Sequence, residues 1–250
     1  VAPIQIYYPD YPGTTGSNCI DYIIADKNLI PQKSRKHYSE KILYMPNTKQ
    51  ATDDTLTKSN KKYTRKQIGL PQDAFIFANF GNPLKITSYE FDIWMQILLS
   101  VPKSVLWLTT SNDISITNLK REAIMREISS DRLIFSSKLP IRDHMSRQEN
   151  ADLVLDTFNY SSGVMTFFAL RSFLPVLTKE GLSYSSRTSL SILSSLGLKE
   201  LIAKNQLEYK MIAIDLAKNR SKHTLLKEKI RNLNGHAPYF SSKQFTKDLE

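Results

Sequence analysis

Five short apolar runs, separated by segments of helix length, constrain the fold of this chain more than any other feature. The runs are Phe75 to Phe80, Val105 to Thr109, Leu133 to Ser136, Leu153 to Asp156 and Pro175 to Thr178. Strand-length apolar runs that alternate with helical segments indicate successive βα units around a parallel sheet. The segment after the first run has one apolar face at helical spacing, formed by Phe91, Trp94, Met95 and Leu98. We therefore predict an α/β fold, a Rossmann-like parallel sheet with flanking helices.

Helical patterns and one polar stretch complete the organisation. Asn112 or Asp113 is expected to cap a helix after the second run. Further helices are predicted at Ser185 to Leu196, Gln206 to Lys218, Ser221 to Leu233 and Lys243 to Leu249, with Gly197 as a stop signal. Residues 49–70 are polar and charged with almost nothing apolar, which predicts a linker or a reduced insertion.

The charge balance favours phosphate-bearing partners without identifying a nucleic-acid protein. The 250 residues include 34 Lys and Arg against 24 Asp and Glu, a net charge of +10. The basic residues are spread along the chain without aromatic interleaving or a nucleic-acid motif. A solvated, lysine-rich surface therefore explains them better than a nucleic-acid interface.

The cysteine and histidine content argues against a disulfide-bonded framework and against a metal site. Cys19 is the single cysteine, so the chain can form no internal disulfide, and we expect a reducing compartment, the cytoplasm. The four histidines show no metal-ligand spacing with one another or with Cys19, so no metal site is predicted. No apolar run reaches membrane-spanning length, and no membrane partner is expected.

Three loops at the carboxyl ends of predicted strands are candidate ligand sites, because parallel sheets bind ligands at that edge. The loop after the first strand carries Lys85, which suits a diphosphate. The loop after the third carries His144, either a ligand contact or a partly exposed histidine at a helix start. The turn after the fourth, Leu155 to Gly163, can present backbone N–H groups to a phosphate where a helix begins.

A resemblance to a known family covers nearly the whole chain. The segments that carry it include Ala2 to Gln5, Tyr11 to Gly16, Ile20 to Asp26, Tyr38 to Lys41, Lys85 to Thr87, Phe91 to Met95, Ser104 to Leu108, Ala151 to Leu153, Leu155 to Thr157 and Leu174 to Thr178. Together they resemble the C-terminal half of the catalytic region of the O-GlcNAc transferase and SPINDLY-like family. The resemblance implies a metal-independent GT-B glycosyltransferase that uses a UDP-sugar and no cofactor. Such enzymes transfer N-acetylglucosamine, or fucose in plant SPINDLY, to Ser and Thr hydroxyls of proteins.

The resemblance also implies roles for particular residues. Lys85 matches the catalytic lysine that neutralises the UDP diphosphate. Asn82 stands where the family has a glutamine near the nucleotide. His144 and Arg147 match positions of the loop on the uracil side, and Leu139 matches a residue that binds uracil through its backbone.

Departures from the family concentrate in the turn after Asp156. Gly163, Val164 and Met165 replace a His-Thr-Thr or Gly-Thr-Thr triplet, and Phe168 replaces an aspartate. Two hydroxyl donors and a ribose-binding carboxylate are therefore absent, each hydrogen bond accounting for about 0.5 to 1.5 kcal/mol. The methionine and the phenylalanines at 167 and 168 are also expected to fill space in the site. The nucleotide site is thus predicted to be eroded.

By the same resemblance, residues 1–48 are the end of the N-terminal catalytic domain and its connection. Residues 49–70 are the polar linker, 71–235 the Rossmann-like nucleotide-binding domain, and 236–250 a C-terminal helix that returns to the N-terminal domain. Most of that domain and the family's helical repeats are absent, so the strand around Ile4 to Tyr8 is expected to lack sheet partners. Two functions remain open: a protein O-glycosyltransferase domain, or a non-catalytic remnant that serves as a structural or protein-interaction module.

Overall fold

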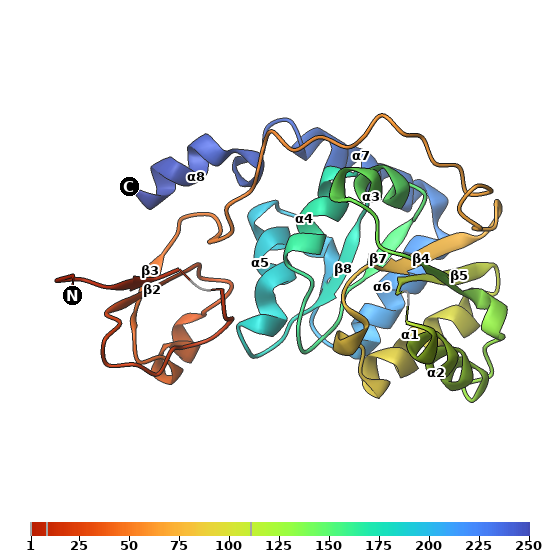
Figure 1. The fold of residues 1–250 in the computed structure, drawn as a ribbon, viewed down its shortest axis with the longest axis horizontal. Helices are drawn as coiled ribbons and strands as arrows, with labels where there is room; N and C mark the ends of the chain where they lie inside the picture. The colour runs from red at the N-terminus through yellow and green to blue at the C-terminus, as the bar shows by residue number, and fades with distance from the viewer. Residues whose placement is uncertain (1, 9, 111) are drawn as a thin grey trace.

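The computed structural model describes residues 2–8, 10–110 and 112–250. Two parallel sheets organise the chain, a three-stranded one near the N-terminus and a six-stranded one in the larger part (Figure 1). None of the helices in the described ranges is long and apolar enough to cross a membrane.

The six-stranded sheet confirms the predicted fold class. Its strands, in spatial order, are β6 (Leu133–Ser136), β5 (Ser104–Thr109), β4 (Phe75–Asn79), β7 (Leu153–Leu155), β8 (Val176–Lys179) and β9 (Ile202–Ala203). Every neighbouring pair is parallel. The chain builds outward from β4 to β6 and then returns to place β7 beside β4. In such sheets, the crevice for a ligand opens at the carboxyl ends of the two strands where the order reverses.

Helices connect and cover these strands. They are α1 (Ser88–Ser100), α2 (Asp113–Ile124), α3 (Ile141–Gln148), α4 (Val164–Arg171), α5 (Thr188–Ser195), α6 (Gln206–Lys218), α7 (Arg220–Leu233) and α8 (Ser242–Leu249). The side chain of Asn112 accepts a hydrogen bond from Ser115 N, which identifies the cap of α2. Gly197 follows α5 with φ +66°, the left-handed conformation that glycine adopts at little cost.

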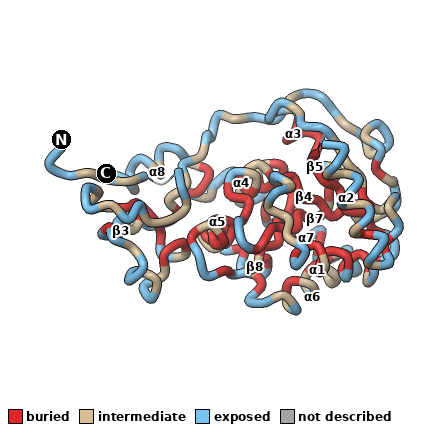
Figure 2. Tube along the Cα trace, turned by 60° about the horizontal axis from the view of Figure 1, so that its bottom comes forward, coloured by how far each residue is buried: buried red, intermediate tan, exposed pale blue. Residues whose placement is uncertain are grey.

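The core lies on both faces of the six-stranded sheet, because successive strand residues point to opposite sides. In β4, Phe77 packs into one cluster, whereas Ile76 and Ala78 pack into the other. In β5, Leu106 and Trp107 divide between the two clusters in the same way. Figure 2 accordingly shows buried residues along the central strands. This packing fixes the carboxyl edge, where the candidate loops emerge.

The N-terminal strand has sheet partners, so the expectation that it would be unpaired was wrong. β1 (Ile6–Tyr7) pairs in parallel with β2 (Tyr22–Ala25), which pairs in parallel with β3 (Lys41–Tyr44). One face of this small sheet packs with Leu29, Ile30 and Tyr184, the last from the larger part of the chain. The sequence predicts a strand around Ile4 to Tyr8 but none at β2 or β3, which complete its sheet.

Hydrogen bonds and ring contacts join the N-terminal part to the larger part. The buried carboxylate of Asp26 accepts a hydrogen bond from Ser191 Oγ at 2.7 Å, and Arg187 Nε donates to the Asn28 carbonyl at 2.5 Å. The last helix, α8, lies beside the small sheet (Figure 1), with Phe245 edge-on to Tyr8 at 6.5 Å between ring centroids.

Residues 49–70 contain no helix or strand and cross the larger part as an extended segment, orange in Figure 1. This segment is tied to α3, because Ser59 N donates to the Arg142 carbonyl at 3.0 Å and Ser146 Oγ donates to the Ser59 carbonyl at 2.8 Å. Farther along, Arg65 forms an ion pair with Asp152 at 2.8 Å. The polar segment therefore packs on the domain along much of its length.

The glycine-containing turn from Tyr11 to Gly16 is a structural loop. Glu40 accepts hydrogen bonds from the hydroxyls of Thr14 and Thr15 at 2.7 and 2.6 Å, and from Thr15 N at 2.6 Å. Burial alone would raise the pKa of Glu40, but these hydrogen bonds together outweigh it and lower the pKa to about 2. A carboxylate of this chain thus takes the donors that a phosphate would need.

Candidate functional site

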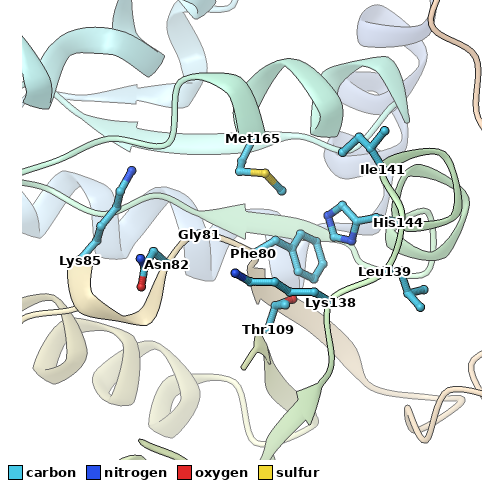
Figure 3. A pocket seen from close by; sticks show the side chains of 10 residues that line it. All are labelled: Phe80, Gly81, Asn82, Lys85, Thr109, Lys138, Leu139, Ile141, His144 and Met165. Atoms are coloured by element: carbon cyan, nitrogen blue, oxygen red, sulfur yellow. The ribbon is translucent and has the colours of Figure 1, made fainter. Parts of the chain in front are cut away.

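A cavity of about 310 Å³ opens at the carboxyl edge of the six-stranded sheet (Figure 3). Its lining comes from the loop after β4, the end of β5, the loop before α3, and α4. The lining residues are Phe80, Gly81, Asn82, Lys85, Thr109, Lys138, Leu139, Ile141, His144 and Met165. The structure thus brings together Asn82, Lys85, Leu139 and His144, which the sequence predicted as site residues. Arg147, Gly163, Val164 and Phe168 lie outside this lining.

Lys85 bridges the loops after β4 and β7. It ends the short 3₁₀ helix Pro83–Lys85, with its Nζ 4.0 Å from the ring centroid of Tyr160 and 3.5 Å from the carbonyl oxygen of Ser161. Burial lowers the pKa of Lys85, and the negative charge of Asp156 partly opposes that shift. A half-buried cation therefore lies at the reversal point of the sheet, where it can meet an anionic ligand.

Asn82 shapes the loop that carries Lys85. Its Oδ1 accepts a hydrogen bond from Leu84 N at 3.1 Å and so caps the 3₁₀ helix. Just before it, Gly81 N donates to Asn79 Oδ1 at 3.0 Å, and Asn79 Nδ2 donates to the Leu155 carbonyl at 2.7 Å. A Cβ atom on Gly81 would lie 3.2 Å from Asn79 Oδ1, so the turn of the chain over the Asn79 side chain favours glycine there.

His144 is buried, with only 5% of its surface exposed, so the alternative of a partly exposed helix-start histidine was wrong. Its ring packs edge-on against Phe80 at 4.9 Å between centroids. Burial, with the positive charge of Arg147 as a second cause, lowers the pKa of His144 to about 4, so the ring is neutral at pH 7.

The partner of the ring assigns its tautomer. Nδ1 of His144 lies 3.4 Å from Nη2 of Arg147, and a guanidinium can only donate. Nδ1 therefore accepts, and the proton is assigned to Nε2. That Nε2 is buried and has no hydrogen-bond partner among the described residues. His144 thus carries an unused donor at the cavity.

Arg147 acts from behind the cavity. Its guanidinium lies over the ring of Trp107 at 5.6 Å, and Nη1 donates to the Ser137 carbonyl at 3.0 Å. The residue therefore holds the loop that carries Leu139 and orients His144, rather than lining the space itself.

Acid should destabilise the fold through His144. Its pKa is about 4 in the folded chain against about 6.5 when unfolded. The unfolded state therefore binds more protons between these values, so stability is fully present above pH 6.5 and is lost as the pH falls to 4. The shift corresponds to about 3 kcal/mol. Urea unfolding of the His144→Phe variant should have a shallower pH slope in this window, and an unchanged slope would contradict the assignment. His223, whose pKa is also lowered by burial, is common to both proteins and cancels.

The turn after β7 is built around Asp156. This fully buried carboxylate accepts hydrogen bonds from Thr157 N at 3.0 Å, Ser162 N at 2.8 Å and Thr178 Oγ1 at 2.8 Å. Gly163 then adopts φ +39°, and a Cβ atom there would lie 3.1 Å from Thr188 Cγ2. The conformation of the turn therefore rests on the carboxylate and the glycine, although the side chains after it are apolar.

Of the apolar residues after the turn, only Met165 lines the cavity (Figure 3). Phe167 is buried on the other side of α4, with ring centroids 6.1 Å from Tyr239 and 6.3 Å from Phe240. Phe168 packs against Phe167. The expectation that the phenylalanines fill the site was therefore wrong: Phe167 anchors the C-terminal segment to the domain, and Phe168 packs beside it.

Sequence reasoning missed Thr109 and Lys138. Thr109 is the last residue of β5, and Lys138 directly precedes Leu139. A polar residue that ends an apolar strand was the available signal for the first, and adjacency to a predicted loop was the signal for the second. As for metals, no three His, Cys, Asp or Glu side chains in the part of the chain that the structure describes come together as ligands.

Comparisons with known proteins agree with this architecture. The model of glycosyl transferase family 41 matches residues 1–55 and 47–249. The probable UDP-N-acetylglucosamine–peptide N-acetylglucosaminyltransferase SEC of Arabidopsis thaliana is 31% identical over 100% of this chain and 26% of its own length. A SPINDLY protein of Petunia hybrida is 28% identical over 100% of this chain and 27% of its own length. The chain thus spans about a quarter of these relatives.

Two solved structures extend the comparison. The O-GlcNAc transferase of Thermobaculum terrenum, solved as a mutant, superimposes with a TM-score of 0.87 at 27% identity, over 99% of this chain and 47% of the other. Anabaena HepE in complex with UDP and glucose gives a TM-score of 0.63 at 15% identity, over 92% and 62%, a likeness of fold alone. Because the family model matches nearly the whole chain, the chain belongs to glycosyl transferase family 41.

Proposed function

We propose that this chain is the C-terminal, donor-binding half of the catalytic region of a UDP-sugar-dependent protein O-glycosyltransferase. Its donor would be UDP-N-acetylglucosamine or a related nucleotide sugar, and its acceptor a Ser or Thr hydroxyl of a protein. Completing the cleft would require an N-terminal catalytic domain, with helical repeats upstream of it. The chemistry would need no metal ion.

One observation carries the proposal: the cavity at the reversal point of a family 41 sheet contains a half-buried lysine and an unused imidazole donor. When a sugar–phosphate bond breaks, negative charge develops on the departing diphosphate. The ammonium of Lys85, held by Tyr160 and Ser161, is the group that would stabilise this charge. The base would occupy the part of the cavity near His144 and Leu139.

The apolar residues that replace the family's hydroxyls at the start of α4 support weak binding of the nucleotide. Val164 and Met165 stand at the start of this helix and offer no hydroxyl, and Met165 N already donates to the Ser162 carbonyl at 2.9 Å. An exposed apolar rim favours the second candidate, a non-catalytic module that binds another protein. Leu84 is 90% exposed, Leu182 89% and Val164 56%, and all three follow strands at this edge.

Lys85→Ala separates these functions. A charge-assisted contact accounts for about 1.5 to 3 kcal/mol, so UDP should bind at least about tenfold more weakly to the variant. Uridine, which lacks the diphosphate, should lose less than about twofold. Magnetic resonance titrations of UDP and uridine would measure both.

Lys103→Ala provides the matched control, because Lys103 is an exposed lysine at the opposite edge of the sheet. Equal losses of UDP and uridine with Lys85→Ala would show that Lys85 does not meet the diphosphate. No detectable binding of UDP to the unaltered chain would favour the non-catalytic module.

A further inference from the structure

The ring of Tyr160 covers the ammonium of Lys85. A lysine has a flexible four-carbon stem, so its ammonium at a protein surface normally samples many rotamers. Here Nζ of Lys85 lies 4.0 Å from the centroid of the Tyr160 ring, well within the distance of about 6 Å over which a ring face attracts a cation. The Ser161 carbonyl oxygen, 3.5 Å from Nζ, adds a second contact from the same turn. The ammonium therefore has a defined place before any ligand binds.

The backbone that carries Tyr160 is held without help from the ring. Thr157 Oγ1 donates a hydrogen bond to the Tyr160 carbonyl at 2.7 Å. On either side of Tyr160, Ser185 Oγ donates to the Asn159 carbonyl at 3.0 Å, and Ser161 N donates to the Ser185 carbonyl at 2.9 Å. Tyr160 itself is 44% exposed, so its side chain adds little to the core. A substitution of this side chain should therefore leave the turn folded.

The backbone of Lys85 is also well defined. Lys85 N donates to the Asn82 carbonyl at 3.0 Å, in the 3₁₀ helix that follows Asn82. Two ordered backbone segments, one after β4 and one after β7, thus bring a cation and a ring face together. Only the contact between the two side chains decides where the ammonium lies.

Few other cations line the cavity. Among the lining residues that the structure describes, Lys85 and Lys138 are the cations at pH 7, because the ring of His144 is neutral. Lys138 is exposed, and in Figure 3 Lys85 lies at the opposite end of the cavity from His144. Positive charge at the Lys85 end therefore depends on how well this one ammonium is placed.

We propose that Tyr160 is a positioning residue, and that the face of its ring holds the Lys85 ammonium where a diphosphate would meet it. This inference rests on the proposed function of the cavity as a nucleotide site. The contact orders the lysine in the free chain, so binding of a ligand does not have to restrict its rotamers. The ring covers one side of the ammonium, and N–H donors on its other sides remain for phosphate oxygens.

Two variants of Tyr160 test this role, with UDP and uridine as the probes. Tyr160→Leu keeps an apolar side chain but removes the ring face, so UDP should bind about two- to tenfold more weakly. Uridine, which lacks the diphosphate, should bind as it does to the unaltered chain. Tyr160→Phe keeps the ring face and removes only the hydroxyl, so it should retain the full affinity for UDP. Magnetic resonance titrations of the full chain at pH 7 would measure all four affinities.

Tyr89→Leu is the matched control. Tyr89 on α1 is 49% exposed, much as Tyr160 is, and its ring packs edge-on against Phe158 at 6.2 Å between centroids. Its replacement should leave the affinities for UDP and uridine unchanged.

Proton shifts of Lys85 test the contact itself, without a ligand. Protons that lie over the face of an aromatic ring resonate upfield, so the ε-methylene protons of Lys85 should be shifted upfield in the unaltered chain and in Tyr160→Phe. In Tyr160→Leu they should return to the ordinary values of lysine. Ordinary values in the unaltered chain would overturn the inference, even if the leucine variant failed to fold.

The binding results separate this inference from the proposed function. Weaker binding of UDP to Lys85→Ala but not to Tyr160→Leu would overturn the inference and leave the proposed function standing. Equal losses in Tyr160→Phe and Tyr160→Leu would overturn it too, because the hydroxyl would then be the group that acts. Tighter binding of UDP to Tyr160→Leu would show that the ring competes with the diphosphate, which also contradicts the inference. Failure of UDP to bind to the unaltered chain would overturn the proposed function and this inference with it.

Discussion

Replacing Asp156 with alanine is expected to lower the free energy of unfolding by about 3 to 5 kcal/mol, the largest effect of any single change at this edge of the sheet. The carboxylate accepts hydrogen bonds from two backbone N–H groups and from the Thr178 hydroxyl, and all three donors are buried with it. Alanine would leave each of them unsatisfied. Urea unfolding monitored by tryptophan fluorescence would measure the loss.

Asp156→Asn is the matched control. Burial raises the pKa of Asp156, so the fold favours an uncharged side chain at this position. Asparagine keeps an acceptor for the backbone, and its amide can donate to the Thr178 hydroxyl, which also accepts. We therefore expect the asparagine variant to lose less than about 1.5 kcal/mol. A loss as large as that of alanine would show that the negative charge itself holds the turn.

Restoring hydroxyls at the start of α4 should strengthen UDP binding. The double variant Val164→Thr and Met165→Thr returns two donors at the positive end of the helix, with about 0.5 to 1.5 kcal/mol for each hydrogen bond. Affinity for UDP should therefore rise about five- to 150-fold. Isothermal titration calorimetry of the variant and of the unaltered chain would measure the gain.

Leu182→Thr adds a hydroxyl at an exposed leucine of the same edge and should leave the affinity unchanged. An unchanged affinity in the double variant would mean that the missing hydroxyls are not what weakens the site. Phe168 offers no such repair, because it packs against Phe167 and an aspartate there would place a charge beside the core.

Periodicity predicted the larger sheet well because its strands are buried on both faces. The run Leu133 to Ser136 coincides with β6, and Val105 to Thr109 differs from β5 by one residue. In contrast, β9 and β1 each span two residues, too few for a pattern in the surrounding sequence to give their bounds and partners. Their place in a sheet is decided by tertiary packing, which local sequence does not encode.

The site was predictable where a loop position alone decides the contact, as for Lys85 and Leu139. The site was less predictable where the direction of a side chain decides whether the residue lines the cavity. Met165 and Phe167 are two positions apart on α4, yet one faces the cavity and the other anchors the C-terminal segment. His144 on α3 packs against Phe80, which follows β4 and is far away in the sequence, so the low pKa of His144 and its unused donor required the tertiary structure.

The central claim is that the cavity between the β4 and β7 loops binds UDP weakly in this chain. Calorimetric titration of UDP into the purified 250-residue chain tests it most directly. The hydroxyl and carboxylate contacts absent at Val164, Met165 and Phe168 predict a dissociation constant near or above about 1 mM, a binding free energy of about 4 kcal/mol or less. A dissociation constant in the low micromolar range would contradict the claim, because the site would then retain the affinity that its residues no longer explain.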